Sequence, residues 1–493
     1  MKYYSTRNKS LRVSGAQAIA QGLSEDGGLF LPESIPAIPL EEIKRLCEMN
    51  YRERAVDIMS RFLDDFSREE LEGFTDSAYA RNFDNFEIAP LSMINDKTAF
   101  LELWHGPTCA FKDMALQMLP HLLTASLKKI GESKCVCILV ATSGDTGKAA
   151  LDGFADIPGT GIVVFYPCDG VSDVQKLQMT TQEGENVHVC AVNGNFDDTQ
   201  TGVKVIFNDR IFAEKLAKKG FLLSSANSIN WGRLLPQIVY YFSAYCDYTA
   251  TGKLAFGEEL DFCVPTGNFG DILAGWYAKK MGLPIRRLIC ASNSNRVLTD
   301  FLATGVYDKN RQFYTTTSPS MDILISSNLE RLLFMLSDDE SVCGWMNELS
   351  TTGKYDVGKD IHAALTAEFT GGCCDDSEAK KAIADVFSEK AYLMDTHTAV
   401  AYKVLENLRE REGSFPTVVV STASPYKFCD SVLEALGKPA DKPGPELLRE
   451  LAQTSGTAIP KPLQRLEGKA SRFEGAVPES EMKAVVESFL SVL

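Results

Sequence analysis

The sequence predicts an α/β protein, because short apolar runs alternate with longer helical patterns along most of its 493 residues. The expected strands are rich in Val, Ile, Leu and Cys, as in sheets covered on both faces: Cys135–Ala141, Gly161–Tyr166, Val187–Val192, Phe221–Ser224, Asp261–Pro265, Arg287–Ala291 and Thr417–Ser421. The intervening segments have helical patterns, at Gly147–Phe154, Thr199–Lys218, Trp231–Cys246 and Ile272–Met281. This alternation is typical of parallel sheets built from βαβ units.

The flanking segments indicate further units. The first ninety or so residues carry acidic helical stretches at Leu40–Asn50 and Arg68–Tyr79, so residues 1–90 are expected to form an N-terminal domain. We expect a smaller α/β domain over 91–225 and a larger one over 226–493, with approximate boundaries that allow interleaving. Asp441–Pro445 is expected to be a linker, and Glu479–Leu493 a closing amphipathic helix. Residues 310–390 carry no recognisable motif and are expected to pack on the larger domain.

Charge and composition exclude several classes of protein. The net charge is −16 with 66 acidic and 50 basic residues, which argues against a nonspecific nucleic-acid binder. No apolar run approaches the length needed to span a bilayer. The 13 cysteines contain no C-x-x-C pair, and none of the five histidines forms an H-x-x-x-H pair, so no metal site is expected. We predict a soluble cytoplasmic protein.

Lys112 is the first candidate for chemistry. It follows the Gly106-Pro107 turn and stands at the start of a predicted helix. In a partly dry site the pKa of a lysine falls, and the neutral amine can form a Schiff base with a carbonyl. A solvated lysine at a helix start remains the alternative when this segment is considered alone.

Turns at the carboxyl ends of predicted strands supply the other candidates, because open α/β sheets bind ligands there. The first turn, Ala141–Lys148, offers the hydroxyls of Thr142 and Ser143 to an anion at a helix N-terminus. It is not a P-loop, since Thr142 and Ala149 occupy the positions that require Gly and Ser or Thr. A simple N-capped turn is equally compatible with this segment.

Three later turns follow the same logic. Gly267 and Gly270 bracket Asn268 and would let backbone amides converge on a phosphate. Ser421–Pro425 is expected to offer two exposed hydroxyls before a helix, and Arg233 stands one turn into the helix that follows Asn227–Asn230. Each also has a structural interpretation, as a capped helix start or a surface ion pair. His397 is expected to lie at a helix start, in a core or capping role.

Together these segments resemble the pyridoxal-phosphate enzymes of the tryptophan-synthase-β type, and among them the threonine synthase family. The resemblance rests on motifs that occur in the family's order: Tyr3-x-Ser5-Thr6-Arg7, Gly22-Leu23-x-x-Asp26-Gly27-Gly28-Leu29-Phe30, His105-Gly106-Pro107-Thr108-x-Ala110-Phe111-Lys112-Asp113, Ser143-Gly144-Asp145-Thr146-Gly147, Asn227-Ser228-Ile229-Asn230-Trp231-x-Arg233, Gly267-Asn268-Phe269-Gly270 and Ser421-Thr422-Ala423-Ser424-Pro425-x-Lys427-Phe428. It implies fold type II, with two open α/β domains around a cofactor cleft and an additional N-terminal domain.

The resemblance also implies a cofactor site. Lys112 would hold pyridoxal 5'-phosphate as a Schiff base, with Phe111 beside it, and Thr422 would face the pyridine nitrogen. The cofactor phosphate would bind a loop consisting of Gly267, Asn268, Phe269, Gly270 and Asp271. Asp145 is expected near the cofactor, but an ionised carboxylate there could not donate a hydrogen bond to the ring oxygen.

The implied substrate is O-phospho-L-homoserine, whose phosphate would be held by Thr142, Ser143, Asn227 and Arg233. The implied reaction removes phosphate from Cγ and adds water at Cβ to give threonine, with Lys112 or the departing phosphate as the base at Cβ. Two alternatives stay open: a threonine-synthase-like phospho-lyase that releases a keto acid and ammonia, and a non-catalytic paralogue with the same fold. No nucleic-acid or membrane partner is expected.

Overall fold

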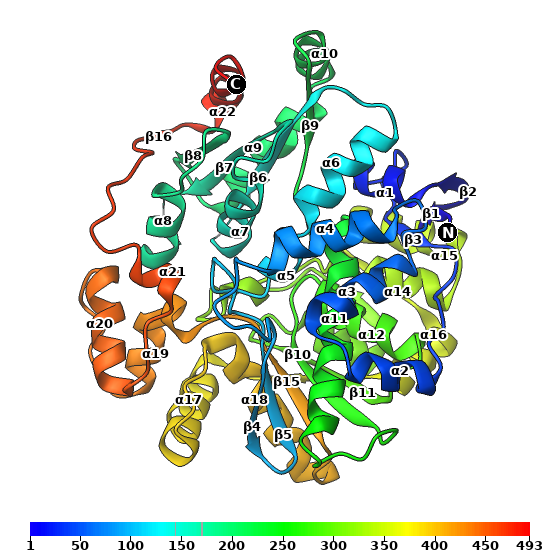
Figure 1. Ribbon diagram of the computed structural model, residues 1–493, viewed down its shortest axis with the longest axis vertical. Helices are drawn as coiled ribbons and strands as arrows, with labels where there is room; N and C mark the ends of the chain where they lie inside the picture. Colours follow the sequence, from blue (N-terminus) through cyan, green and yellow to red (C-terminus); the bar gives the residue numbers. More distant parts are fainter. Residues whose placement is uncertain (143, 169–170) are drawn as a thin grey trace.

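Two largely parallel sheets form the body of the protein in a computed structural model, which describes residues 1–142, 144–168 and 171–493 (Figure 1). Within these residues the larger sheet has six strands in the order β14-β11-β10-β15-β5-β4. They are β4 (Leu91–Asn95), β5 (Thr98–Glu102), β10 (Leu260–Pro265), β11 (Ile285–Ser292), β14 (Phe369–Cys373) and β15 (Thr417–Ser421). The edge pair β4–β5 is antiparallel and the other pairs are parallel.

The smaller sheet is parallel and has the order β16-β8-β7-β6-β9. Its strands are β6 (Cys135–Ala141), β7 (Thr160–Pro167), β8 (Val187–Val192), β9 (Phe221–Ser224) and β16 (Ala476–Val477). Every residue of β7, β10 and β15 is buried, which agrees with the prediction of strands covered on both faces. The α/β prediction is therefore confirmed.

Helices cover both sheets and connect their strands (Figure 1). Around the smaller sheet they are α5 (Asp113–Leu116), α6 (Leu119–Lys129), α7 (Asp145–Phe154), α8 (Asp173–Thr180), α9 (Phe196–Asn208), α10 (Arg210–Lys218) and α22 (Met482–Leu490). Around the larger sheet they are α11 (Trp231–Ala250), α12 (Gly270–Lys280), α13 (Val297–Thr304), α14 (Leu329–Leu336), α15 (Asp339–Thr351), α16 (Gly358–Glu368), α17 (Asp376–Lys390), α18 (Thr396–Glu412), α19 (Cys429–Ala435), α20 (Gly444–Ser455) and α21 (Lys461–Gln464). None of the described helices is long and apolar enough to cross a membrane.

The N-terminal region packs on α11. It consists of β1 (Tyr3–Ser5), β2 (Asn8–Val13), α1 (Gly15–Gln21), β3 (Phe30–Pro32), α2 (Leu40–Cys47), α3 (Tyr51–Ser60) and α4 (Arg68–Tyr79). The Tyr3 ring meets that of Trp231 edge-on, with centroids 5.6 Å apart, and both side chains are fully buried. Arg7 makes a two-point ion pair with Glu330, at 3.0 and 2.9 Å, so the N-terminal motif serves to dock this region.

The chain interleaves the two sheets. Strands β4 and β5, which the sequence analysis places with residues 91–225, pair through β5 with β15 of the larger sheet. The C-terminal β16 and α22, placed by the sequence analysis in the larger domain, pair with β8 and pack on the smaller sheet. Parallel pairing joins strands that are distant in sequence, so the order of elements along the chain does not reveal this exchange.

Two segments differ from the sequence expectation or extend it. The helix predicted over Thr199–Lys218 is divided in two, because Asp209 is extended and its carboxylate caps α10 by accepting from the Phe212 N–H. The unassigned segment 310–390 contributes β14 to the larger sheet, and β12 (Val306–Asp308) pairs with its β13 (Lys354–Asp356). It also carries a short 3-10 turn, η1 (Pro319–Met321), which reaches the candidate site.

Candidate active site

Lys112 lies between the two sheets, directly before α5. The preceding residues run beside the loop that follows β15: Phe111 N–H donates to the Thr422 carbonyl at 2.7 Å, and Ala110 forms a bridge with Ala423. Phe111 and Thr422, both predicted at the cofactor site, are thus neighbours of Lys112. The turn is fixed from within, since Thr108 donates through N–H and Oγ1 to Asp113 at 2.8 and 2.6 Å.

The Lys112 side chain is half-buried among charged groups. Burial is the main cause that lowers its pKa, Asp145 opposes it, and the cations Arg233 and Lys427 add to it; together they bring the pKa to about 8. Its Nζ donates to the Ser320 hydroxyl at 3.1 Å. With this pKa a minor but appreciable fraction of Lys112 is neutral at physiological pH, and the neutral amine is the form that makes a Schiff base and accepts protons.

Asp145 is a buried anion at the start of α7. Burial raises the pKa of its carboxyl group, but the positive charges of Lys427 and Lys112 outweigh that effect and hold the pKa well below its usual range. Gln175 Nε2 also donates to Asp145, at 2.7 Å. Asp145 is therefore an ionised acceptor, and it cannot donate a hydrogen bond to a ring oxygen.

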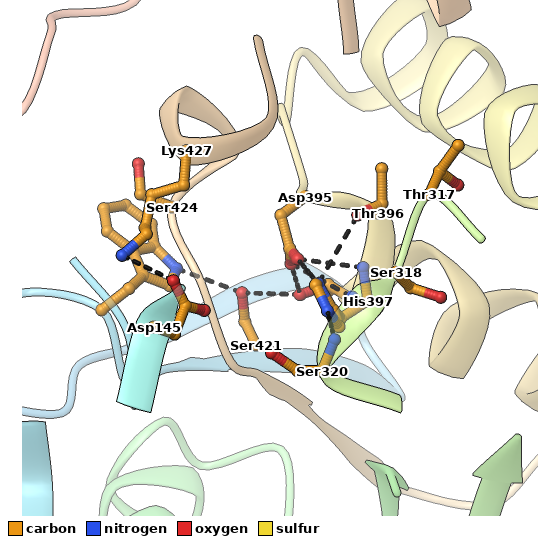
Figure 2. Close-up of polar contacts among 12 residues, drawn as sticks. Asp145, Thr317, Ser318, Ser320, Asp395, Thr396, His397, Ser421, Ser424 and Lys427 are labelled. Carbon is orange, nitrogen blue, oxygen red and sulfur yellow. Dashed lines mark hydrogen bonds and ion pairs between the residues drawn. The ribbon is translucent and has the colours of Figure 1, made fainter. Parts of the chain in front are cut away.

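Lys427 is a site residue that the sequence analysis did not propose. It is fully buried, lies 2.7 Å from an Asp145 carboxylate oxygen and donates to the Thr108 carbonyl at 2.9 Å (Figure 2). Its signal was present in the Ser424-Pro425-x-Lys427 part of the last motif, which was interpreted through its hydroxyls alone. Lys427 thus gives the buried Asp145 carboxylate a positive partner.

The glycine loop after β10 forms an anion cradle. Phe269 adopts a left-handed conformation with φ of 62° and is the N-cap residue of α12, so the loop N–H groups gather at a helix N-terminus. Among the described residues, no hydrogen bond uses the N–H groups of Gly267, Asn268 or Phe269 as donors. A Cβ on Gly267 would lie 2.6 Å from the Ser320 carbonyl oxygen, so only glycine fits there.

Asp271, also predicted in this loop, directs its carboxylate elsewhere. Tyr240 and Tyr241 of α11 donate to its Oδ1 at 2.6 and 2.8 Å, and burial raises its pKa to about 6. The side chain joins α12 to α11, which leaves the backbone N–H as the part of Asp271 that can bind a phosphate.

The residues predicted for the substrate phosphate differ in their contacts. Arg233 is 4% exposed and donates from Nη1 to the Ala226 carbonyl at 2.8 Å, while its Nε has no hydrogen-bond partner among the described residues. Burial lowers its pKa to about 10. It pairs with no carboxylate in the part of the chain that the structure describes, so it is a buried cation with free donors, placed to bind an anion.

The other three residues predicted to bind the substrate phosphate give less support for that role. Thr142 Oγ1 accepts from the N–H groups of Gly144 and Gly147, at 3.0 and 2.9 Å, so it caps α7 and keeps only its hydroxyl proton for a ligand. Asn227 is exposed, and its Oδ1 accepts from the Ile229 N–H at 3.3 Å. Ser143 lies outside the described residues.

His397, expected at a helix start, is the second residue of α18 and is 2% exposed. Its Nδ1 lies 2.7 Å from Asp395 Oδ2, and its Nε2 accepts from the Ser320 N–H at 3.1 Å. Ser320 is not among the residues predicted from the sequence, because it stands in a segment without a motif.

Three family models match the chain and together cover most of it. The model described as "Threonine synthase N terminus" matches residues 2–79, "Pyridoxal-phosphate dependent enzyme" matches 99–424, and "Threonine synthase, C-terminal" matches 398–487. A threonine synthase from Pseudomonas aeruginosa is 39% identical over 438 residues, which are 88% of this chain and 90% of that protein. The chain belongs to the threonine synthase family.

Further similar proteins support the same family. A solved structure of pyridoxal-phosphate-bound threonine synthase from Brucella melitensis has a TM-score of 0.89 and 38% identity, covering 100% of this chain and 99% of that one. A human protein named threonine synthase-like 1 is 42% identical over 433 residues, 85% of this chain. The chain spans only 58% of the length of that relative. The predicted family and fold type are confirmed, and the cofactor of the family is pyridoxal phosphate.

The residues present fit this cofactor. A half-buried amine of lowered pKa, a loop with free N–H donors at a helix N-terminus and a threonine after β15 meet in one place. The N–H groups of the loop match a phosphate dianion, and the amine matches an aldehyde.

Proposed function

We propose that this protein is a threonine synthase, which converts O-phospho-L-homoserine and water to L-threonine and phosphate and so completes threonine biosynthesis. The proposal rests mainly on the environment of Arg233. Its guanidinium is buried, and among the described residues its Nε has no hydrogen-bond partner and the group has no carboxylate partner. It acts on the pKa of Lys112, so it lies within electrostatic reach of that amine. A phosphorylated amino acid suits these two residues, because its phosphate could bind the Arg233 guanidinium and its Cα could face the Lys112 amine.

The cofactor would be held by residues of both sheets. Lys112 would bind its aldehyde carbon, the loop Gly267–Asp271 its phosphate, and Thr422 its ring nitrogen, with Phe111 alongside. Pyridoxal phosphate, when bound, supplies an electron sink for the electrons released when a proton leaves the substrate Cα. Asp145 and Lys427 would form a fixed charge pair beside it.

The substrate would be oriented by its phosphate. Arg233 would bind phosphate oxygens through its free donors, and Thr142, Ser143 and Asn227 are proposed as further contacts. This binding would hold Cα within reach of Lys112 Nζ, which would remove the Cα proton as a neutral amine. Loss of phosphate from Cγ and addition of water at Cβ then give threonine.

The cysteines support a reducing compartment as the place of action. All 13 cysteine residues are free thiols, although Cys373 and Cys374 are adjacent and several others are partly exposed. Free thiols are typical of cytoplasmic proteins, and we place the enzyme there.

The deciding experiment incubates the purified protein and pyridoxal phosphate with O-phospho-L-homoserine. Phosphate, threonine and 2-oxobutanoate are quantified in one reaction, with Lys112→Ala as the inactive reference. Equal amounts of phosphate and threonine support the proposal. Phosphate with equal 2-oxobutanoate and ammonia would instead make the protein a phospho-lyase, and no phosphate would exclude both activities.

A further inference from the structure

Ser320 is the one neutral side chain that hydrogen-bonds the Lys112 amine among the described residues. We propose that Ser320 is a positioning residue for Lys112, held in place by the buried Asp395–His397 pair. Its role is to keep the lysine nitrogen in one place while that nitrogen gains and loses a proton. This inference rests on the proposed function only in so far as Lys112 acts as the base.

The contact suits both protonation states of the amine. Lys112 Nζ and Ser320 Oγ are 3.1 Å apart, and no other hydrogen bond engages this hydroxyl within the described residues. A hydroxyl can accept from an ammonium group, and it can donate to the lone pair of a neutral amine. Ser320 can therefore hold the nitrogen before and after a proton transfer.

The position of Ser320 is fixed by His397. The Ser320 N–H donates to His397 Nε2 at 3.1 Å, and His397 Nδ1 lies 2.7 Å from Asp395 Oδ2 (Figure 2). Asp395 is fully buried, and its carboxylate accepts the Nδ1 proton, so Nε2 keeps its lone pair for the Ser320 N–H. Figure 2 shows the His397 ring between the Asp395 carboxylate and the backbone of Ser320.

The turn that carries Ser320 is anchored on its other sides as well. Asn293 Nδ2 donates to the Ser318 hydroxyl at 3.0 Å, and the Thr317 hydroxyl donates to Asp376 at 3.0 Å. The Ser320 carbonyl oxygen lies only 2.6 Å from the position that a Cβ on Gly267 would occupy, so the turn also contacts the glycine loop after β10. The turn with Ser320 therefore contacts both the Lys112 amine and the glycine loop, and it fixes the position of one relative to the other.

The charged groups around Lys112 do not position its amine through a hydrogen bond. Asp145 on α7, Arg233 on α11 and Lys427 after β15 all influence the pKa of Lys112 through their charge. No hydrogen bond joins any of them to its Nζ within the described residues, so they set the charge environment and Ser320 supplies the directional contact.

The test compares Ser320→Ala with Ser320→Thr and with Ser318→Ala, which removes one anchor of the same turn but no contact with Lys112. The first readout is the pKa of Lys112, measured in the full-length chain without added cofactor by competitive labelling with trace acetic anhydride across pH. Loss of a charge-assisted acceptor should lower this pKa by about one unit in Ser320→Ala. Ser320 is partly exposed, so the methyl group of Thr fits, and Ser320→Thr and Ser318→Ala should keep the wild-type pKa.

The second readout is steady-state kinetics with the loaded enzyme. Ser320→Ala should lower kcat about tenfold and leave KM within about twofold, because the lost contact orients the base and not the substrate phosphate. Wild-type Lys112 pKa and kcat in Ser320→Ala would overturn the proposal. An equal pKa shift in Ser318→Ala would also overturn it, since the cause would then be a general disturbance of the turn.

The role of the Asp395–His397 pair is tested by Asp395→Asn. An amide can donate to Nδ1 and so place the proton on Nε2, where it would face the Ser320 N–H. The Lys112 pKa and kcat should shift in the same direction as in Ser320→Ala, with the fold checked by circular dichroism. A folded Asp395→Asn protein with wild-type values would exclude His397 as the anchor.

These readouts separate the inference from the proposed function. The labelling experiment uses no substrate, so it reports on Ser320 even if the wild-type protein releases phosphate without making threonine. Conversely, a wild-type protein that makes threonine, together with wild-type Lys112 pKa and kcat in Ser320→Ala, would refute the inference alone.

Discussion

The side-chain nitrogen of Lys427 lies 2.7 Å from a carboxylate oxygen of Asp145, and neither side chain is more than 4% exposed. The two residues come from different parts of the chain, α7 and the turn η2 (Pro425–Phe428) after β15. The pair therefore joins the smaller and the larger sheet beside Lys112. Breaking it would leave one buried charge without its partner.

Lys427→Met should destabilise the protein by about 3–5 kcal/mol, because it leaves the Asp145 carboxylate buried and unpaired. Urea denaturation followed by circular dichroism measures this change. Lys380→Met removes an exposed ion pair with Glu434 and should cost less than about 1 kcal/mol. Similar losses in the two variants would mean that the buried pair does not join the domains.

Arg233→Met should raise KM for O-phospho-L-homoserine and lower kcat/KM by roughly 10–100-fold, since it removes about 1.5–3 kcal/mol of charge-assisted hydrogen bonding. Stability should not fall, because the substitution removes a cation whose pKa burial already lowers to about 10. Arg296→Met, on an arginine that is 54% exposed and paired with Asp300, serves as the control. An unchanged KM would exclude Arg233 from substrate binding.

Gly267→Ala should weaken cofactor binding by at least about tenfold, because its Cβ would lie 2.6 Å from the Ser320 carbonyl and displace the phosphate loop. Titration of pyridoxal phosphate, followed by visible absorbance, measures the affinity. Gly344→Ala is the matched control: it lies in α15 with no atom within 4 Å of a new Cβ. That change should keep the affinity and raise stability by up to about 1 kcal/mol.

His105 should make stability depend on pH. Burial by itself lowers its pKa, but Asp84 and Glu102, each 2.8 Å from a ring nitrogen, raise it to about 9. The unfolded value is 6.5, so the stabilisation is fully present below about pH 6.5 and is lost as the pH rises to about 9.

The measurement compares thermal unfolding of the wild type and His105→Gln at pH 6 and pH 9.5. The wild type should lose about 2–3 kcal/mol more than the variant over this interval. His121→Gln should behave like the wild type, since His121 stacks on Phe74 and burial lowers its pKa. Equal pH dependence in wild type and His105→Gln would refute the assignment.

Local patterns predicted the central elements well. The predicted bounds of β6, β8, β9 and β15 match the structure, because continuous apolar runs flanked by turn residues admit few other arrangements. The helix over Thr199–Lys218 was predicted without its break, since the capping role of Asp209 becomes visible only with the backbone conformation. The motif residues Lys112, Gly267 and Thr422 were recognisable because each stands at a turn with defined chemistry.

The sequence by itself determined the α/β class and the family and singled out Lys112 as the candidate lysine, since these depend on local periodicity and on motifs that are contiguous in the chain. Only the tertiary structure decided that β5 and β16 exchange between the sheets, that Asp145 pairs with Lys427, and that Ser320 reaches Lys112. The contacts of Lys427 and Ser320 span 282 and 208 positions of the sequence, respectively. Such contacts depend on how separate elements pack, and no local pattern encodes that packing.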